Sequence, residues 1–273
     1  MTITIIFSDN IEYKYNNFEE ILKINNYNDI IHIYCWGSNL YSLPELPDSL
    51  TGLWCGYNKL SSLPELPNSL KILKFYNNNL SSLPELPNSL TELMCYNNNL
   101  SNLPKLPNSL KILRCFNNKI LSLPELPNSL TELLCYNNNL SNLPKLPNSL
   151  QNLTCSYNNV SSLPELPNSL VSLFCFYNNL SSLPELPNSL IDLRCYNNKI
   201  YNLSNLPNLL TNLWCNNNNL SSLPELPKSL THIDYYNNPI YNHIQNIFDG
   251  DTKKYFEYHN NIKRKFVNKI GIW

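Results

Sequence analysis

Charged residues are scarce in this 273-residue chain, where they make up 14% of the total against roughly 25% in an average soluble protein. The formal net charge is only −1, so no strong electrostatic field is available to attract nucleic acid or an anionic membrane. No apolar run reaches the ~18 residues that a membrane-spanning helix needs. Binding driven mainly by charge and insertion into a membrane are therefore disfavoured.

Glycine and histidine are scarce as well, with five glycines and four histidines in the chain. So few glycines form no glycine-rich phosphate loop. His32, His232, His243 and His259 lie toward the two ends of the chain, and no acid and base recur together in phase between them. We therefore expect a protein that is not an enzyme and that uses no cofactor.

The cysteines, in contrast, follow a strict spacing. Seven of them stand 20 residues apart from Cys95 to Cys215, and Cys35 and Cys55 keep the same phase. A fixed period of this length is typical of a solenoid, in which each repeat buries its apolar side only against its neighbours. We therefore predict a repeat array that grows along one axis.

The column of cysteines indicates packing rather than chemistry. Phe75 and Tyr235 stand in the same column, which a buried apolar position tolerates and a ligand or bridging position does not. Zinc-binding cysteines stand in close sequence pairs, whereas no two cysteines here are nearer than 20 positions. On parallel neighbouring strands the Cβ atoms run side by side instead of converging, as a disulfide requires. We expect buried free thiols, without metal sites or disulfides.

One repeat, residues 90–109, reads L-T-E-L-M-C-Y-N-N-N-L-S-N-L-P-K-L-P-N-S. It fits the pattern L-x-x-L-x-L-x-x-N-x-L, with Cys95 at the third leucine. Side chains on a strand alternate between its two faces, so Leu93 and Cys95 should point inward. Met94 and Tyr96 should then point outward. Eleven such strand segments open at 20-residue steps, at Ile30, Leu50, Leu70, Leu90, Leu110, Leu130, Leu150, Leu170, Leu190, Leu210 and Leu230.

The second half of each repeat, L-P-E-L-P-N-S-L in Leu83 to Leu90, resembles the 20-residue class of leucine-rich repeats in bacterial effectors such as the YopM and IpaH proteins. The resemblance covers residues 30–240 and implies a concave parallel sheet. Paired prolines such as Pro84 and Pro87 exclude a helix, so the convex side should be extended or polyproline-like. The IpaH relatives carry a ubiquitin-ligase domain after their repeats, and the roughly 33 residues that follow here are too few for one.

An asparagine column runs from Asn58 to Asn238 at the end of each strand, and only Ser38 breaks it. An inward asparagine offers both a hydrogen-bond acceptor and donors. We expect each one to satisfy backbone groups of its own repeat and of the next repeat.

The two ends of the array should be covered by other structure. We predict an N-terminal cap over residues 1–29, with a hairpin from strands near 2–7 and 11–15 and a helix near 18–24. The leucine-rich repeat array follows over residues 30–240. Residues 241–273 should form a C-terminal helical cap, because 252–270 places its apolar residues on one helical face. The basic residues of that helix leave a membrane or partner motif as an alternative.

The columns on either side of the cysteine vary between repeats and face outward, so we look for recognition there. They form an aromatic stripe with two arginines, residue types that are enriched at interface hot spots. A peptide or protein partner laid along the concave face is the leading hypothesis. The candidate partner-binding residues are Tyr34, Trp36, Trp54, Tyr76, Met94, Tyr96, Arg114, Phe116, Leu134, Tyr136, Phe174, Phe176, Arg194, Tyr196, Trp214 and Tyr236.

Two alternatives stand beside a protein partner. Aromatic residues interleaved with arginine can bind single-stranded nucleic acid, by stacking on bases and neutralising phosphates. Alternatively, the stripe stabilises the sheet by cross-strand stacking and the protein has a purely structural role without a specific ligand. The columns hold three positive groups that four carboxylates on the same face oppose: Lys74, Arg114 and Arg194 against Glu92, Glu132, Asp192 and Asp234.

The N-terminal stretch of residues 1–7 lacks the basic flank of a signal peptide, so an intracellular, cytoplasmic location is expected. The heavy use of Asn, Ile, Tyr and Lys resembles proteins of AT-rich genomes, including those of amoebae and the leucine-rich repeat proteins of Mimivirus. That resemblance implies host cytoplasm and a host-directed role if the chain is viral. Neither the partner nor the oligomeric state can be read from the sequence.

Overall fold

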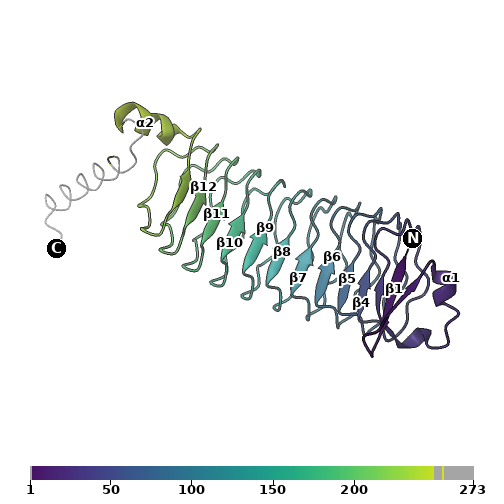
Figure 1. The fold of residues 1–273 in the computed structure, drawn as a ribbon. Helices are drawn as coiled ribbons and strands as arrows, with labels where there is room; N and C mark the ends of the chain where they lie inside the picture. Colours follow the sequence, from purple (N-terminus) through teal and green to yellow (C-terminus); the bar gives the residue numbers. More distant parts are fainter. Residues whose placement is uncertain (1, 249–253, 255–273) are drawn as a thin grey trace.

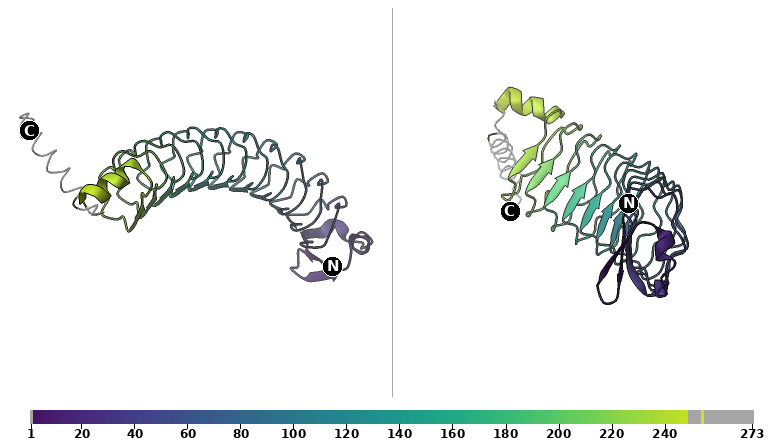
Figure 2. Two further views of the ribbon diagram at one scale, coloured as in Figure 1. Left: turned by 90° about the horizontal axis from the view of Figure 1, so that it is seen from above. Right: turned by 45° about the vertical axis from the view of Figure 1, so that its right-hand side comes forward.

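The computed structural model describes residues 2–248 and residue 254. Thirteen strands form one sheet in the spatial order β13 to β3, then β1 and β2. From β3 to β13 neighbouring strands are parallel, and equivalent residues of successive repeats lie opposite each other, as Leu93 and Leu113 do. The coils stack into an arc with the sheet along its inner side (Figures 1 and 2). The predicted leucine-rich repeat solenoid is confirmed.

The eleven parallel strands recur once per predicted segment, and all but the first are three residues long. The first begins at the predicted Ile30, whereas each of the others begins two residues after its predicted leucine. They are β3 Ile30–Tyr34, β4 Gly52–Trp54, β5 Ile72–Lys74, β6 Glu92–Met94, β7 Ile112–Arg114, β8 Glu132–Leu134, β9 Asn152–Thr154, β10 Ser172–Phe174, β11 Asp192–Arg194, β12 Asn212–Trp214 and β13 His232–Asp234.

An antiparallel extension covers the N-terminal edge of this sheet. β1 (Ile3–Phe7) pairs with β3 on one side and with β2 (Glu12–Tyr15) on the other. The short helix α1 (Phe18–Ile21) and the 3-10 helix η1 (Tyr27–Asp29) complete the connection to β3. β1 therefore occupies the edge of β3 that would otherwise expose unpaired backbone groups.

At the C-terminal end, helix α2 (Pro239–Phe248) follows the last strand directly. The predicted helical cap over 241–273 placed its apolar helical face at 252–270, which lies outside the described residues apart from 254. Proline fits the first turn of a helix because its missing N–H would have no partner there. Ile240 keeps the phase of the repeat leucines and is 2% exposed, and its N–H donates to the Leu220 carbonyl at 2.9 Å. The helix therefore starts from within the repeat pattern.

The core is a set of residue columns that run the length of the arc. All nine cysteines are free and 0% exposed, and Phe75 and Tyr235 are buried in the same column. Leu93 is likewise 0% exposed on the inward side of its strand. The prediction that this column faces inward is confirmed. Each repeat therefore buries its leucines and its cysteine against the two adjacent repeats.

The asparagine column forms a hydrogen-bond ladder inside the arc. The Asn138 amide donates from Nδ2 to the carbonyl oxygens of Cys135 and Cys115, at 3.1 Å each. Its Oδ1 accepts the N–H of Ile120 at 3.0 Å. Each asparagine thus serves its own repeat and the preceding one. Our expectation that it would serve the next repeat was wrong, because the side chain points back toward the strand that precedes it in the stack.

The convex side is extended, as the prolines predict, and carries a second ladder that we did not anticipate. A turn closes each repeat, with the Leu90 N–H donating to the Pro87 carbonyl at 3.1 Å. The Ser89 hydroxyl then donates to the carbonyl of Leu70, one repeat back, at 2.6 Å. Leu209 replaces the serine in one repeat and is 57% exposed. Apart from the repeat that carries Leu209, the two ladders tie successive repeats together on both sides of the core.

Candidate partner-binding surface

The residues after the cysteines lie on the outward face of the sheet, and we call them the post-cysteine column. In its central part, four rings stack in parallel from Tyr76 through Tyr96 and Phe116 to Tyr136. Their centroids lie 4.6, 4.2 and 4.3 Å apart. Phe176 and Tyr196 form a second stack at 4.4 Å. The strand spacing of a parallel sheet produces these distances, because equivalent side chains lie in register.

The stripe is not continuous along the sheet. Gly56, Ser156 and Asn216 stand in the post-cysteine column where an aromatic ring would otherwise lie, and all three are buried. Gly56 therefore separates Trp36 from the stack that begins at Tyr76. Ser156 separates the end of that stack, Tyr136, from the stack of Phe176 and Tyr196. The Ser156 Oγ and the Asn216 Oδ1 have no hydrogen-bond partner in the described part of the chain.

Tyrosines from the next position partly fill two of these gaps. This position, which we call the left-handed column, has a positive φ in every repeat, and three tyrosines occupy it with φ of 52° or 53°: Tyr57, Tyr157 and Tyr177. The Tyr57 ring packs edge-on against Trp36 and Tyr76, on either side of Gly56. Tyr157 packs edge-on against Phe176. Sequence reasoning missed these residues, although two of the three directly follow a gap in the stripe.

The residues before the cysteines form the pre-cysteine column, which is mixed in character. Tyr34 and Trp54 stack at 4.3 Å, and the Trp54 ring lies against the Cα of Gly52, where no side chain intervenes. Three cations follow farther along, and each has a carboxylate partner. The ion pairs are Lys74–Glu92 at 3.0 Å, Arg114–Glu132 at 2.6 Å and Arg194–Asp192 at 3.0 Å.

Most of the candidate residues are half-buried. Trp36 and Tyr236 expose more, 57% and 47% of their surface. Met94 is only 8% exposed and therefore offers a partner little surface, contrary to its place in the predicted stripe. The half-buried ones are Tyr34, Trp54, Tyr76, Tyr96, Arg114, Phe116, Leu134, Tyr136, Phe174, Phe176, Arg194, Tyr196 and Trp214.

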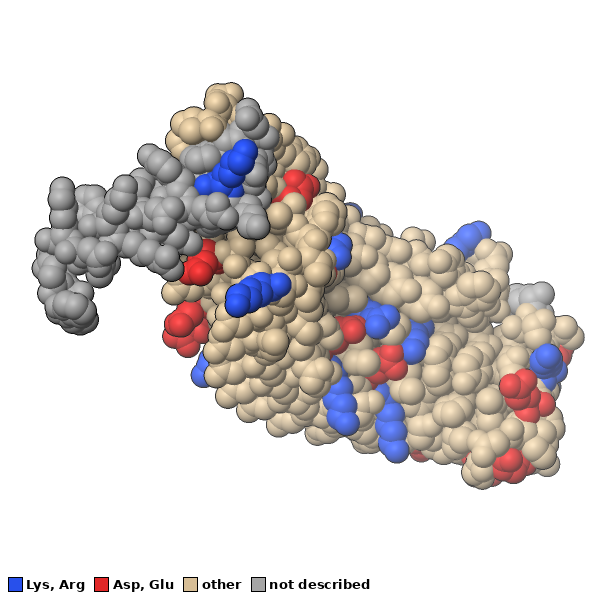
Figure 3. Space-filling model, turned by 60° about the vertical axis from the view of Figure 1, so that its left-hand side comes forward, with Lys and Arg blue, Asp and Glu red and all other residues tan. Residues whose placement is uncertain are grey.

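A hollow of about 420 Å³ lies on this face at the C-terminal end of the array. The Arg194 guanidinium lies 4.4 Å from the Phe174 ring centre and 5.8 Å from that of Trp214. Space-filling atoms show basic and acidic residues interspersed on a mainly uncharged surface (Figure 3). The hollow is lined by Tyr177, Arg194, Tyr196, Asn197, Trp214, Asn216, Asn217, Asp234 and Tyr236.

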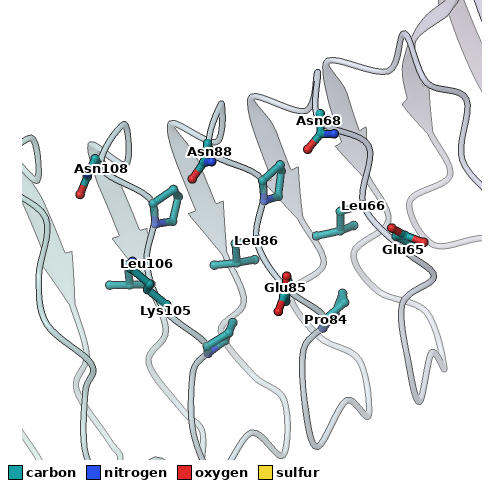
Figure 4. Close-up of a pocket in the computed structure, with 13 residues that line it drawn as sticks. Glu65, Leu66, Asn68, Pro84, Glu85, Leu86, Asn88, Lys105, Leu106 and Asn108 are labelled. Carbon is teal, nitrogen blue, oxygen red and sulfur yellow. The ribbon is translucent and has the colours of Figure 1, made fainter.

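A larger hollow of about 760 Å³ lies on the convex side, between the proline segments of adjacent repeats (Figure 4). Glu65, Glu85 and Lys105 are its charged residues, and leucines form its floor. Hollows with the same lining recur farther along, around Pro164 and Pro184. Because the feature repeats with the scaffold, we attribute it to the packing of L-P-x-L-P segments rather than to a specific site.

The buried thiols are held in their protonated form. Burial raises the pKa of the Cys115, Cys155 and Cys195 thiols to about 12, and a protonated thiol is a poor nucleophile. Partial burial also raises the pKa of the Tyr96 and Tyr196 phenols, which therefore remain neutral donors. Within the described residues, no three His, Cys, Asp or Glu side chains are grouped as a metal site would require. None of the helices described combines the length and apolar character that a membrane crossing needs.

No family model and no curated protein sequence matches the chain. Among solved structures, YopM from Yersinia enterocolitica WA-314 is similar at 33% identity and a TM-score of 0.54, over 72% of this chain and 53% of YopM. The chain thus spans about half the length of that protein. A leucine-rich effector protein, YopM from Yersinia pestis, is 33% identical with a TM-score of 0.51, over 76% of this chain and 78% of that one. The leucine-rich repeat domain of APL1B shares the fold, with a TM-score of 0.66 at 20% identity, over 81% and 72% of the two chains.

Proposed function

Since the chain belongs to the leucine-rich repeat proteins of the YopM type, we propose that it is a non-catalytic scaffold that binds a protein or peptide partner along the strand face of the arc. Leucine-rich repeat neighbours support a protein-interaction scaffold in general. The post-cysteine stacks around Tyr96 and Phe116 support this particular surface. The nine buried free thiols suit a reducing, intracellular location.

The observation that carries the proposal is the arrangement of the central stack. Tyr76, Tyr96, Phe116 and Tyr136 lie side by side, with their faces against one another and part of each ring still exposed. Such a row presents a rigid apolar surface with phenol hydroxyls along it. Rigid aromatic side chains lose little conformational entropy on binding, which is why they dominate many recognition surfaces.

The three cations of the pre-cysteine column favour a protein partner over single-stranded nucleic acid. Lys74, Arg114 and Arg194 each have a carboxylate within 3.0 Å, so their charges are compensated on the protein itself. A nucleic-acid groove needs unpaired positive charge along the phosphate backbone. Binding of single-stranded RNA that weakens steeply with added salt would reverse this preference.

The test is a pull-down from cell lysate with the combined variant Tyr96→Ala, Phe116→Ala and Tyr136→Ala. We expect the variant to lose at least one protein that the unchanged chain retains at stoichiometric yield. The matched control removes three exposed side chains from the convex side, by Asn88→Ala, Asn108→Ala and Asn128→Ala. This control should still retain the protein that the stripe variant loses. Circular dichroism establishes that all three proteins are folded. Identical sets of captured proteins from the stripe variant and the unchanged chain would reject the proposal.

A further inference from the structure

The hollow at the C-terminal end of the strand face has aromatic walls and a polar floor. Tyr196, Trp214 and Tyr236 line it from three successive repeats, and Asn216 lies between them, 5% exposed. Trp214 is tilted against His232 on one side, with ring centres 4.3 Å apart. Aromatic rings around a polar floor are typical of sites that bind a group with an apolar stem and a polar head.

Two hydrogen-bond acceptors in this hollow have little or no compensation in the described part of the chain. Asp234 forms no salt bridge there, and its carboxylate receives only the Tyr236 N–H, at 3.4 Å. The buried Oδ1 of Asn216 receives no hydrogen bond at all. A buried acceptor without a donor is costly, so its presence in a lined hollow points to a ligand that brings donors.

The neighbouring strand shows how this face accommodates a cation. The Arg194 guanidinium lies over the ring of Phe174. It donates to both carboxylate oxygens of Asp192, from Nε to Oδ1 at 3.2 Å and from Nη2 to Oδ2 at 3.0 Å. The same column continues with Trp214 and then Asp234, so a carboxylate stands two repeats beyond the cation Arg194. Because Arg194 is already paired with Asp192, no described residue forms a salt bridge with Asp234.

We infer that this hollow is a subsite for a lysine or arginine side chain of the partner, a deepening that rests on the proposed function. The cationic head lies over Asn216 among the aromatic walls and donates to Asp234 and to the Oδ1 of Asn216. Ammonium and guanidinium groups are donors only, and they bind aromatic faces through cation–π attraction. An anionic group would meet the Asp234 charge, and an apolar side chain would leave Asn216 without a donor.

The test uses a minimal probe, N-acetyl-L-arginine methylamide, with the neutral isostere N-acetyl-L-citrulline methylamide as its matched control. Binding is followed by ligand-observed saturation-transfer NMR on the full chain. We expect the arginine compound to bind at least about tenfold more tightly than the citrulline compound, because charge assistance and cation–π attraction act only on the former. Equal affinities for the two compounds, or no binding of either, would overturn the inference.

Variants then place the probe in the hollow. Asp234→Asn removes the carboxylate charge with little change in shape and should weaken arginine binding about fivefold or more. Glu225→Gln removes the same charge from an exposed position on the convex side and should leave it unchanged. Asp234→Asn with unaltered affinity would place the probe elsewhere and reject the subsite. Circular dichroism of both variants shows whether a loss reflects unfolding.

Failure of the subsite is distinguishable from failure of the proposed function. If the arginine probe does not bind while the central-stack variant still loses a captured protein, only the subsite is rejected. If the probe binds in the hollow while that variant retains every captured protein, partner binding along the central stack is rejected instead.

Discussion

The ring of Tyr96 lies flat against the ring of Phe116, with centroids 4.2 Å apart and planes inclined by 10°. Phe116 makes an equivalent contact with Tyr136 on its other side, at 4.3 Å. The same rings thus stabilise the sheet and form the surface proposed for a partner. Stability and binding measurements on the same variants separate these two contributions.

The first prediction concerns the stack itself. Phe116→Leu removes two ring contacts and should lower the free energy of unfolding by about 1–3 kcal/mol, because aromatic pairs contribute about 0.5–1.5 kcal/mol each beyond their buried area. Urea unfolding followed by circular dichroism measures the change. Tyr236→Leu is the control, since this ring stands in the same column without a stacked aromatic neighbour among the described residues. Equal losses in the two variants would mean that stacking contributes nothing.

The second prediction concerns the asparagine ladder. Asn138→Ala leaves the buried Ile120 N–H without its partner. The carbonyls of Cys115 and Cys135 each lose one of two asparagine donors and keep the other. A buried polar group that loses its partner costs about 1–3 kcal/mol, so we expect a loss of about that size. Asn139→Ala, one residue away and exposed, should change the unfolding free energy by less than about 0.5 kcal/mol. Similar losses at the two positions would contradict the ladder's role.

The third prediction concerns the left-handed column. Tyr157 has a φ of 52°, a conformation that asparagine tolerates and a β-branched residue does not. Tyr157→Asn and Tyr157→Val both lose the stacking contact with Tyr177, so their difference isolates the backbone. We expect the valine variant to be less stable than the asparagine variant by about 1–2 kcal/mol in chemical unfolding. Equal stabilities would show that the repeat shifts to a negative φ without cost.

The fourth prediction concerns pH. Burial raises the pKa of Cys115, Cys155 and Cys195 from the ordinary 9.0 to about 12. The unfolded chain therefore ionises first, so stability is fully present below pH 9.0 and declines from there toward pH 12. Each thiol contributes about 1.4 kcal/mol per pH unit to this decline.

The matched variant for pH changes all three cysteines to alanine. Above pH 9 the unfolding free energy of this variant should fall less steeply than that of the unchanged chain. The difference between the two slopes should be about 4 kcal/mol per pH unit. Below pH 8 the two curves should run parallel, since the thiols are protonated in both states. Urea unfolding at half-unit steps of pH gives both slopes. Curves that stay parallel above pH 9 would show that these thiols ionise as readily in the fold as outside it.

The repeat columns could be predicted from the sequence because the same environment recurs in every repeat. Cys95 and Asn98, read beside their equivalents, identify an inward strand position and an inward turn. The direction of the Asn98 hydrogen bonds could not be predicted, because it depends on how one coil sits on the other. Neither could the edge-on packing of Tyr57, which follows from a left-handed backbone that the residue type does not favour.

The hollow at the C-terminal end was only partly visible in the sequence. Arg194, Tyr196, Trp214 and Tyr236 belong to the predicted stripe, but Asn216 was not among the candidate residues. Its importance comes from burial between rings of the adjacent repeats, which no single repeat reveals. Helix α2 starts two residues before the predicted helical cap of residues 241–273, since Pro239 marks the end of a repeat pattern and equally the start of a helix.

The asparagine ladder also gives the arc a direction. The N–H of Leu60 is satisfied by Asn78, 18 residues farther along the chain, and the same offset recurs for Leu80 and Asn98. During synthesis, the N–H of such a leucine therefore has no side-chain acceptor until the asparagine of the next repeat has left the ribosome. Each coil of the arc is thus completed by the coil that follows it in the sequence.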